Sequence, residues 1–291
     1  MLHEKSFSSR LADIIIVIFL VVFSIIMLYP MLYVIFTSFS EPALLIRHRG
    51  ILLRPLGFET LAYRIVLANP RILTGYMNTL FVLVVGLVFN LVLTCLGAYF
   101  LSRKNVFWFK PIMMMILISM YFSGGLIPFF LTVRNLGMYN SLWSLILPTA
   151  ISTYNMIVLR TYFQTIPDSL VESVYIDGGG HIAILVKIFI PLSVPAMAVM
   201  MLYYGVGHWN SWFNAMIFIR ESSKFPLQLI LRDMLLLGSS LDIRNAGADY
   251  NQIEEAVKAA TIVVSTLPIL CIYPFLQKYF VGGLMIGSLK E

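Results

Sequence analysis

Apolar residues along the 291-residue chain gather into runs of about twenty, separated by shorter polar segments. A helix of about 20 apolar residues is long enough to cross the hydrocarbon core of a bilayer. The predicted spans cover residues 12–37, 74–102, 106–133, 139–162, 188–219 and 259–276. Six crossings place both termini on one side of the membrane. The pattern therefore predicts an all-α membrane protein with six transmembrane helices.

Composition agrees with this pattern, because 59% of the residues are hydrophobic and only 12% are charged, whereas a soluble domain has about 25%. The first apolar run exceeds the 7 to 15 residues of a signal-peptide core, so we expect an anchor that is retained. Cys95 and Cys271 fall inside predicted spans, where small apolar packing residues are expected. The net charge of +6 comes from residues scattered among loops. It indicates membrane anchoring and no nucleic-acid partner.

Two of the connecting segments are long, about 40 residues each, and lie on the same predicted face. The second contains a helix-like run over residues 227–237. These loops either cap the helix bundle or dock a partner protein. Basic residues are almost equally numerous on the two faces, so the positive-inside rule does not decide the orientation.

The spans carry no charged side chain near their middle. Ion-driven carriers generally place a carboxylate there, because an intramembrane charge is costly and marks a coupling site. The sequence also contains no G-x-x-x-x-G-K-[ST] phosphate loop, and no acid–base or metal-binding constellation within the spans. The chain is therefore predicted to be no enzyme, with no catalytic residue and no metal site. If it moves a solute uphill, another protein must supply the energy.

The segment "ESVYIDGGGHIAILVKIFIPLSVPAM" begins at Glu172 and interrupts this apolar pattern. Ser169 stands three residues before Glu172, a spacing that predicts a capping box and the start of a helix. Asp177 and Gly178 predict its end. One side of this helix is formed by Leu170, Val171, Val174 and Tyr175. Seven residues give a helix roughly 10 Å long, too short to be stable alone, so it needs a surface to pack against.

These residues resemble the EAA loop of permease subunits in ATP-binding-cassette importers. The positions that match the motif are Glu172, Asp177, Gly178, Ile188, Pro191 and Pro195. Ser173 and Val174 replace its two alanines. Segments 123–148 and 207–235 and the C-terminal tail are similar to carbohydrate permeases related to the second maltose permease, in the branch that carries complex oligosaccharides. The tail departs from that pattern at Gly282, where the family often has lysine.

The resemblance implies a type I ABC importer permease fold in a bacterial plasma membrane, with both termini cytoplasmic. It divides the chain into an N-terminal helix with an extracellular loop (1–73), a core permease domain (74–281) with its EAA loop at 167–187, and a cytoplasmic tail (282–291). It also implies four kinds of partner besides lipid: a second, non-identical permease, two ATPase subunits, an extracellular sugar-binding protein and the oligosaccharide. ATP and magnesium would be bound by the ATPase, so the chain itself is expected to hold no cofactor.

The resemblance gives the short helix the role of a coupling helix that sits in a cleft of the ATPase. The residues assigned to this contact are Ser169, Leu170, Val171, Glu172, Val174, Tyr175, Asp177 and Gly178. Pro191 and Pro195 are expected to kink the base of the fifth span, so that it acts as a stiff lever. The alternative hypothesis is a self-sufficient secondary carrier or channel.

Polar residues in the fifth predicted span suggest a path for sugar. Tyr203, Asn210 and Asn214 recur at helical spacing, with Trp209 and Trp212 beside them. Amides bind sugar hydroxyls and aromatic rings cover the apolar faces of sugars. The same residue types also anchor helices at membrane interfaces and join helices to each other. His208 is expected to lie at the interface and not to act as a ligand or a base.

Overall fold

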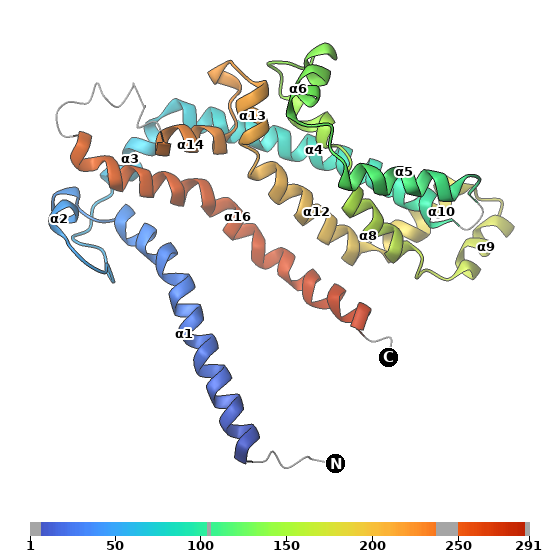
Figure 1. Ribbon diagram of the computed structural model, residues 1–291, viewed down its shortest axis with the longest axis horizontal. Helices are drawn as coiled ribbons and strands as arrows, with labels where there is room; N and C mark the ends of the chain where they lie inside the picture. Colours follow the sequence, from blue (N-terminus) through green and yellow to red (C-terminus); the bar gives the residue numbers. More distant parts are fainter. Residues whose placement is uncertain (1–6, 104–105, 237–249, 289–291) are drawn as a thin grey trace. The chain divides into compact units, whose positions relative to one another are not determined.

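The computed structural model describes residues 7–103, 106–236 and 250–288, and all regular elements in these ranges are helices (Figure 1). This agrees with the sequence pattern, because long apolar runs satisfy their own backbone hydrogen bonds only as helices in lipid. The chain forms two compact units. Unit 1 comprises Met1–Asn69 and Asp233–Thr266, and unit 2 comprises Pro70–Arg232 and Leu267–Glu291.

Unit 1 contains α1 (Phe7–Ser38), α2 (Pro42–Arg47), α3 (Leu61–Ala68) and the first part of α16 (Tyr250–Ser288). The first long loop folds back onto the end of α1. Leu52 N–H donates to Tyr29 Oη at 3.1 Å, and Ser38 Oγ lies 2.7 Å from Tyr63 Oη. Burial raises the pKa of Tyr63. The loop thus packs against its own helix, while its capping of the helix bundle or docking of a partner stays a prediction.

Unit 2 is built around α4 (Pro70–Ser102), which packs against α8 and α12 (Figure 1). Its other elements are α5 (Phe109–Tyr121), α6 (Leu126–Asn135), α7 (Trp143–Ile146), η1 (Leu147–Thr149), α8 (Thr153–Phe163), α9 (Asp168–Ile176), α10 (His181–Ile184), a π-helical turn η2 (Leu185–Phe189), α11 (Ile190–Leu192), α12 (Val194–Trp209), α13 (Phe213–Phe218), η3 (Ser222–Lys224), the part of α14 (Leu227–Leu236) up to Arg232, and the part of α16 from Leu267.

Small residues and buried polar groups join these helices, as expected where lipid is as apolar as the core itself. A Cβ atom on Gly86 of α4 would lie only 2.5 Å from His208 Nε2 of α12, so only glycine permits this approach. Thr94 Oγ1 lies 2.7 Å from Tyr204 Oη in the same interface. Cys95 is buried there, as expected, whereas Cys271 is exposed and does not pack in the core.

Three of the described helices are long and apolar enough to cross a membrane: Leu11–Ser38, Pro70–Ser102 and Ile253–Ile272. Two bent pairs also pass if each counts as one span: Phe109–Tyr121 with Leu126–Asn135, bent by 112°, and His181–Leu192 with Val194–Trp209, bent by 85°. The remaining predicted span, 139–162, is broken into α7, η1 and α8 because Pro148 interrupts it. The described residues therefore provide three to five candidate spans, where six were predicted.

Two segments predicted from the sequence, 227–237 and 282–291, extend beyond the described residues. The predicted run 227–237 is helix α14, Leu227–Leu236, and Leu237 lies outside the described residues. The predicted tail 282–291 is helical up to Ser288, because α16 continues through Gly282, while residues 289–291 lie outside the described residues.

Candidate functional site: a short exposed helix and a polar cavity

The short helix expected from the EAA loop is α9, which has nine residues, Asp168–Ile176. It begins two residues earlier than expected. Pro167 is the N-cap and Ser169 is already the second helical residue, so the expected capping box between Ser169 and Glu172 is wrong. Proline fixes the extended conformation before the helix, and Asp168 supplies the negative charge that favours a helix N-terminus.

The C-terminus of α9 is closed by a Schellman motif. Gly178 has a φ of +77°, its N–H bonds to the carbonyl of Tyr175 at 3.0 Å, and Gly179 N–H bonds to the carbonyl of Val174 at 2.8 Å. This left-handed position favours glycine because it lacks a Cβ atom. The helix thus ends at the pair Asp177–Gly178 that the sequence indicated.

Most of α9 faces outward. Val171 is its buried residue and Val174 is half-buried, whereas Ser169, Leu170, Glu172 and Tyr175 are exposed. A cavity of about 920 Å³ lies beside it, with Asp168, Val171 and Glu172 in its wall. Arg103 and His181 line other parts of this cavity, but α9 itself contains no basic residue, so its own exposed surface is acidic and apolar. A basic partner surface would complement it.

The span that follows α9 is bent by 85° at Ser193, between Pro191 and Pro195. Neither proline has an N–H group, so the helical bonds to the residues four positions earlier are missing. A π-helical turn, Leu185–Phe189, precedes the bend. The two prolines therefore lie at the bend between the segment near α9 and α12.

A second cavity of about 680 Å³ lies between the broken segment α7–α8 and the junction of α12 with α13. Its polar lining residues are Thr149, Ser152, Asn155, Tyr203, Tyr204, His208, Asn210, Ser211, Trp212 and Asn214. Tyr203, Asn210, Trp212 and Asn214 were all expected to lie along one path. The structure brings these four into one wall.

Two details of the expected path are wrong. The residues do not share one continuous helix, since α12 ends at Trp209 and α13 begins at Phe213. Asn210, at the end of α12, leaves the helical conformation and turns the chain around the cavity. Trp209 does not line the cavity. It is 3% exposed and packs near Tyr76 of α4, with ring centroids 6.3 Å apart.

His208 is buried within the bundle, which corrects the expected place at the interface. Its Nε2–H donates to Asn90 Oδ1 at 2.7 Å, and the Asn90 amide donates to the carbonyls of Thr149 and Ala150 at 2.8 and 3.0 Å. Asn90 thereby joins α4 to two parts of the cavity wall. The helical spacing did not point to the wall residues Ser152 and Tyr204. They come together because the helical segment 139–162 is interrupted.

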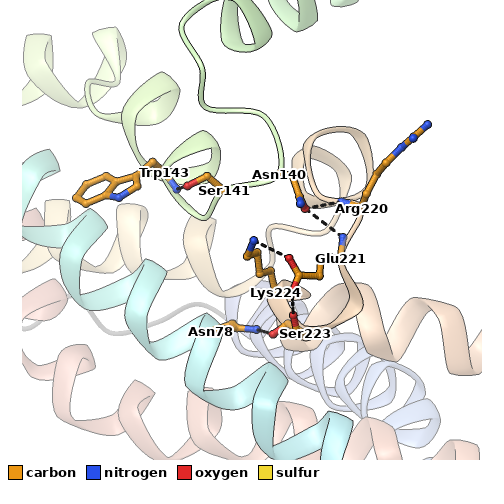
Figure 2. A network of polar contacts seen from close by, with 8 residues as sticks. All are labelled: Asn78, Asn140, Ser141, Trp143, Arg220, Glu221, Ser223 and Lys224. Carbon is orange, nitrogen blue, oxygen red and sulfur yellow. Dashed lines mark hydrogen bonds and ion pairs between the residues drawn. The ribbon is translucent and has the colours of Figure 1, made fainter.

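A second polar network joins the loops near Asn78, in the N-terminal part of α4 (Figure 2). Asn140 Oδ1 accepts the backbone N–H groups of Arg220 and Glu221 at 3.1 Å each, and Asn78 donates to the carbonyl of Ser223 at 2.8 Å. Hydrogen bonds from Lys224 and Ser223 lower the pKa of the Glu221 carboxyl. This network fixes the loop that follows α13, close to the chain segment that lines the cavity.

Buried hydrogen bonds between helices, broken helices and a cavity lined by hydroxyl and amide groups define a multi-pass membrane protein that handles a polar solute.

No family model matches the chain. It is 39% identical over 284 residues to the polygalacturonan/rhamnogalacturonan transport system permease protein YtcP of Bacillus subtilis, covering 97% of this chain and 99% of that protein. It is also 39% identical to protein LplC of the same organism over 285 residues, covering 97% and 96% of the two chains.

Among solved structures, the chain is similar to a subunit of a bacterial ABC transporter involved in the import of the acidic polysaccharide alginate. The TM-score is 0.89 and the identity 33%, with 94% of this chain and 98% of that chain covered. The chain therefore belongs to the permease subunits of sugar ATP-binding-cassette importers. Its similarity to these proteins supports the importer hypothesis over the self-sufficient carrier.

Proposed function

We propose that this chain forms half of the translocation pathway of an ATP-driven oligosaccharide importer and is itself no enzyme. The observation that carries the proposal is the cavity of about 680 Å³ beside the α12–α13 junction. Its hydroxyl, amide and indole groups are those that bind sugars. The exposed α9 is the part of the chain that would bind the ATPase, with Glu172 facing a basic residue of that subunit.

The proposed assembly contains a second, non-identical permease, two ATPase subunits and an extracellular sugar-binding protein. ATP and magnesium would bind to the ATPase, so this chain needs no cofactor of its own. We place α9 and both termini in the cytoplasm of a bacterial cell, with six crossings of which the broken segment 139–162 is the fourth. The bend at Pro191 and Pro195 would then connect α9 to the cavity wall as a lever.

The substrate that we propose is an oligosaccharide that carries carboxylates. Arg232 of α14 is outside the cavity wall but lies over the ring of Trp212, which is part of that wall, with Cζ 5.1 Å from the ring centroid. An indole face can cover a sugar ring, and a guanidinium can bind a carboxylate in a bidentate manner. The names of two similar proteins, polygalacturonan/rhamnogalacturonan permease and importer of the acidic polysaccharide alginate, agree with this chemistry.

The proposed assembly predicts that the tagged chain, purified in mild detergent from its native cell, brings an ATPase and a second permease with it. In liposomes this complex should import labelled oligogalacturonides, alginate oligomers or maltodextrins only when ATP is present on the cytoplasmic side. Both partners should be lost with Glu172→Lys, which reverses the charge on the exposed face of α9. A chain that purifies alone and transports without ATP would instead show a carrier.

Replacing Arg232 with glutamine tests the acidic substrate. Import of oligogalacturonides should fall about tenfold, the value of one charge-assisted hydrogen bond, while import of maltodextrin should change little. Arg220→Gln is the matched control, because it removes the same charge from a side chain that extends away from the polar network (Figure 2). An equal fall for both sugars would refute the preference for carboxylates.

A further inference from the structure

Three side chains from three segments meet next to α9. His181 Nδ1 lies 2.9 Å from Tyr99 Oη of α4 and 3.1 Å from Tyr175 Oη of α9. Both tyrosine rings meet the imidazole edge-on, with centroids 6.0 and 5.8 Å away. We call Tyr99, Tyr175 and His181 the Tyr–His–Tyr clamp. It is a contact between the C-terminal part of α4, the last turn of α9 and the first residue of α10.

Aromatic and cation–π contacts continue from the clamp into the bundle. The guanidinium of Arg103 lies 5.3 Å from the centroid of the Tyr99 ring and 4.6 Å from that of Phe189. Phe189 belongs to the π-helical turn before the bend and packs edge-on against Phe163 of α8 at 5.1 Å. Contacts therefore lead without a gap from α9 to α4, α8 and the base of the bent span.

The clamp holds the C-terminal end of α9. Val171 is the buried side chain of this helix and Val174 is half-buried, while Asp168 has an interaction at the N-terminal end. The clamp fixes the last turn through Tyr175, so movement of that turn reaches α4 through His181 and Tyr99.

The clamp also reaches a helix that the peptide chain does not join to α9. Along the backbone α9 is connected only to α8 and α10. Tyr99 adds α4, and α4 carries Asn90, whose amide is bonded to Thr149 and whose carbonyl oxygen is bonded to His208. Thr149 and His208 both line the cavity of about 680 Å³. A displacement of Tyr99 along α4 would thus reach the cavity wall.

We propose that the Tyr–His–Tyr clamp passes the movement of α9 to α4, which makes Tyr99 and His181 positioning residues for ATP-driven transport. The proposal rests on the proposed function of α9 as the contact with the ATPase. Energetic coupling between distant sites can be carried by a contiguous set of packed side chains and hydrogen bonds. The clamp and α4 form such a set, in parallel with the bent span.

The test compares three variants in the complete importer reconstituted in liposomes: Tyr99→Phe, His181→Ala and the double variant. Import of labelled oligogalacturonides, or of whichever of the three sugars the wild type imports, is measured together with release of phosphate. Each single variant should lower the amount of sugar imported per ATP hydrolysed about fivefold, the lower end of typical coupling between sites. The double variant should be no worse, since both changes remove the same contact. Tyr154→Phe on α8 removes an exposed hydroxyl and should leave the ratio unchanged.

A purely structural role would lower import and ATP hydrolysis together and leave their ratio unchanged, which would overturn the proposal. Additive effects in the double variant would also overturn it. So would failure of both single variants to assemble with the ATPase, because the clamp would then hold subunits together without transmitting movement. A wild-type complex that imports no sugar with ATP refutes the proposed function itself, whereas wild-type import with unchanged variants refutes only the clamp.

Discussion

Gly178→Pro is expected to abolish ATP-driven uptake while leaving the amount of the chain in the membrane unchanged. Gly178 has a φ of +77°, and its N–H closes the end of α9 by bonding to the carbonyl of Tyr175. Proline holds φ near −65° and has no N–H group. Both features of the helix end are therefore lost, and the exposed face of α9 can no longer keep its direction. Uptake, membrane content and ATPase co-purification measured on the same cells check this.

Alanine substitutions supply the matched controls. A Cβ atom added to Gly178 or to Gly180 would meet no other atom within 4 Å, so added volume is harmless at both positions. They differ in backbone: Gly180 has a φ of −93°, which any residue adopts. Gly178→Ala should cost about 1 to 2 kcal/mol of local stability and lower uptake partly, whereas Gly180→Ala should behave as wild type. Equal uptake by the two variants would contradict the role given to the left-handed turn.

Asn90→Ala is expected to give a large loss of stability in unit 2 for the truncation of a single polar side chain. The Asn90 side chain is fully buried and makes three hydrogen bonds, to His208, Thr149 and Ala150. Hydrogen bonds between membrane helices are worth about 0.6 kcal/mol on average, and a buried group left unpaired costs about 1 to 3 kcal/mol. We expect a total near 3 kcal/mol and a fall in Tm of at least about 5 °C, measured on the detergent-purified complex.

Asn78 on the same helix offers the comparison. Its amide also donates to two carbonyls, those of Ser223 and Phe225 at 2.8 and 3.0 Å, but the side chain is only partly buried. Water or lipid headgroups can replace its partners. Asn78→Ala should therefore lower the Tm by about a third as much or less. A similar fall in Tm in both variants would show that burial of the asparagine side chain does not determine the loss of stability.

The sequence allowed α9 and its end to be predicted because local rules determine both. Asp177 followed by Gly178 encodes a helix stop through backbone conformation alone. The N-terminus was predicted two residues late, since a serine–glutamate spacing competed with Pro167, which fixes the chain direction before the helix. Local chemistry at a helix start is ambiguous when two capping patterns overlap.

The cavity was predicted only in part because it depends on where helices break. Tyr203, Asn210 and Asn214 were found through helical spacing, and Trp212 as a residue beside them, yet they reach the cavity through the turn after Trp209 and not along one helix face. Trp209, the other residue expected beside them, is buried elsewhere. His208 and Asn90 form a pair across 118 positions of sequence. Spacing within one helix holds no information on such a pair.

The length of α4 between its two attachments has a consequence for how this chain can vary. Asn78 binds the loop after α13 and Tyr99 binds His181, and the 21 residues from one to the other (99 − 78) span about 32 Å of helix. One inserted or deleted residue would turn one attachment by about 100° relative to the other. Related sequences can therefore gain or lose residues in loops, whereas the segment of α4 between positions 78 and 99 must keep a single length.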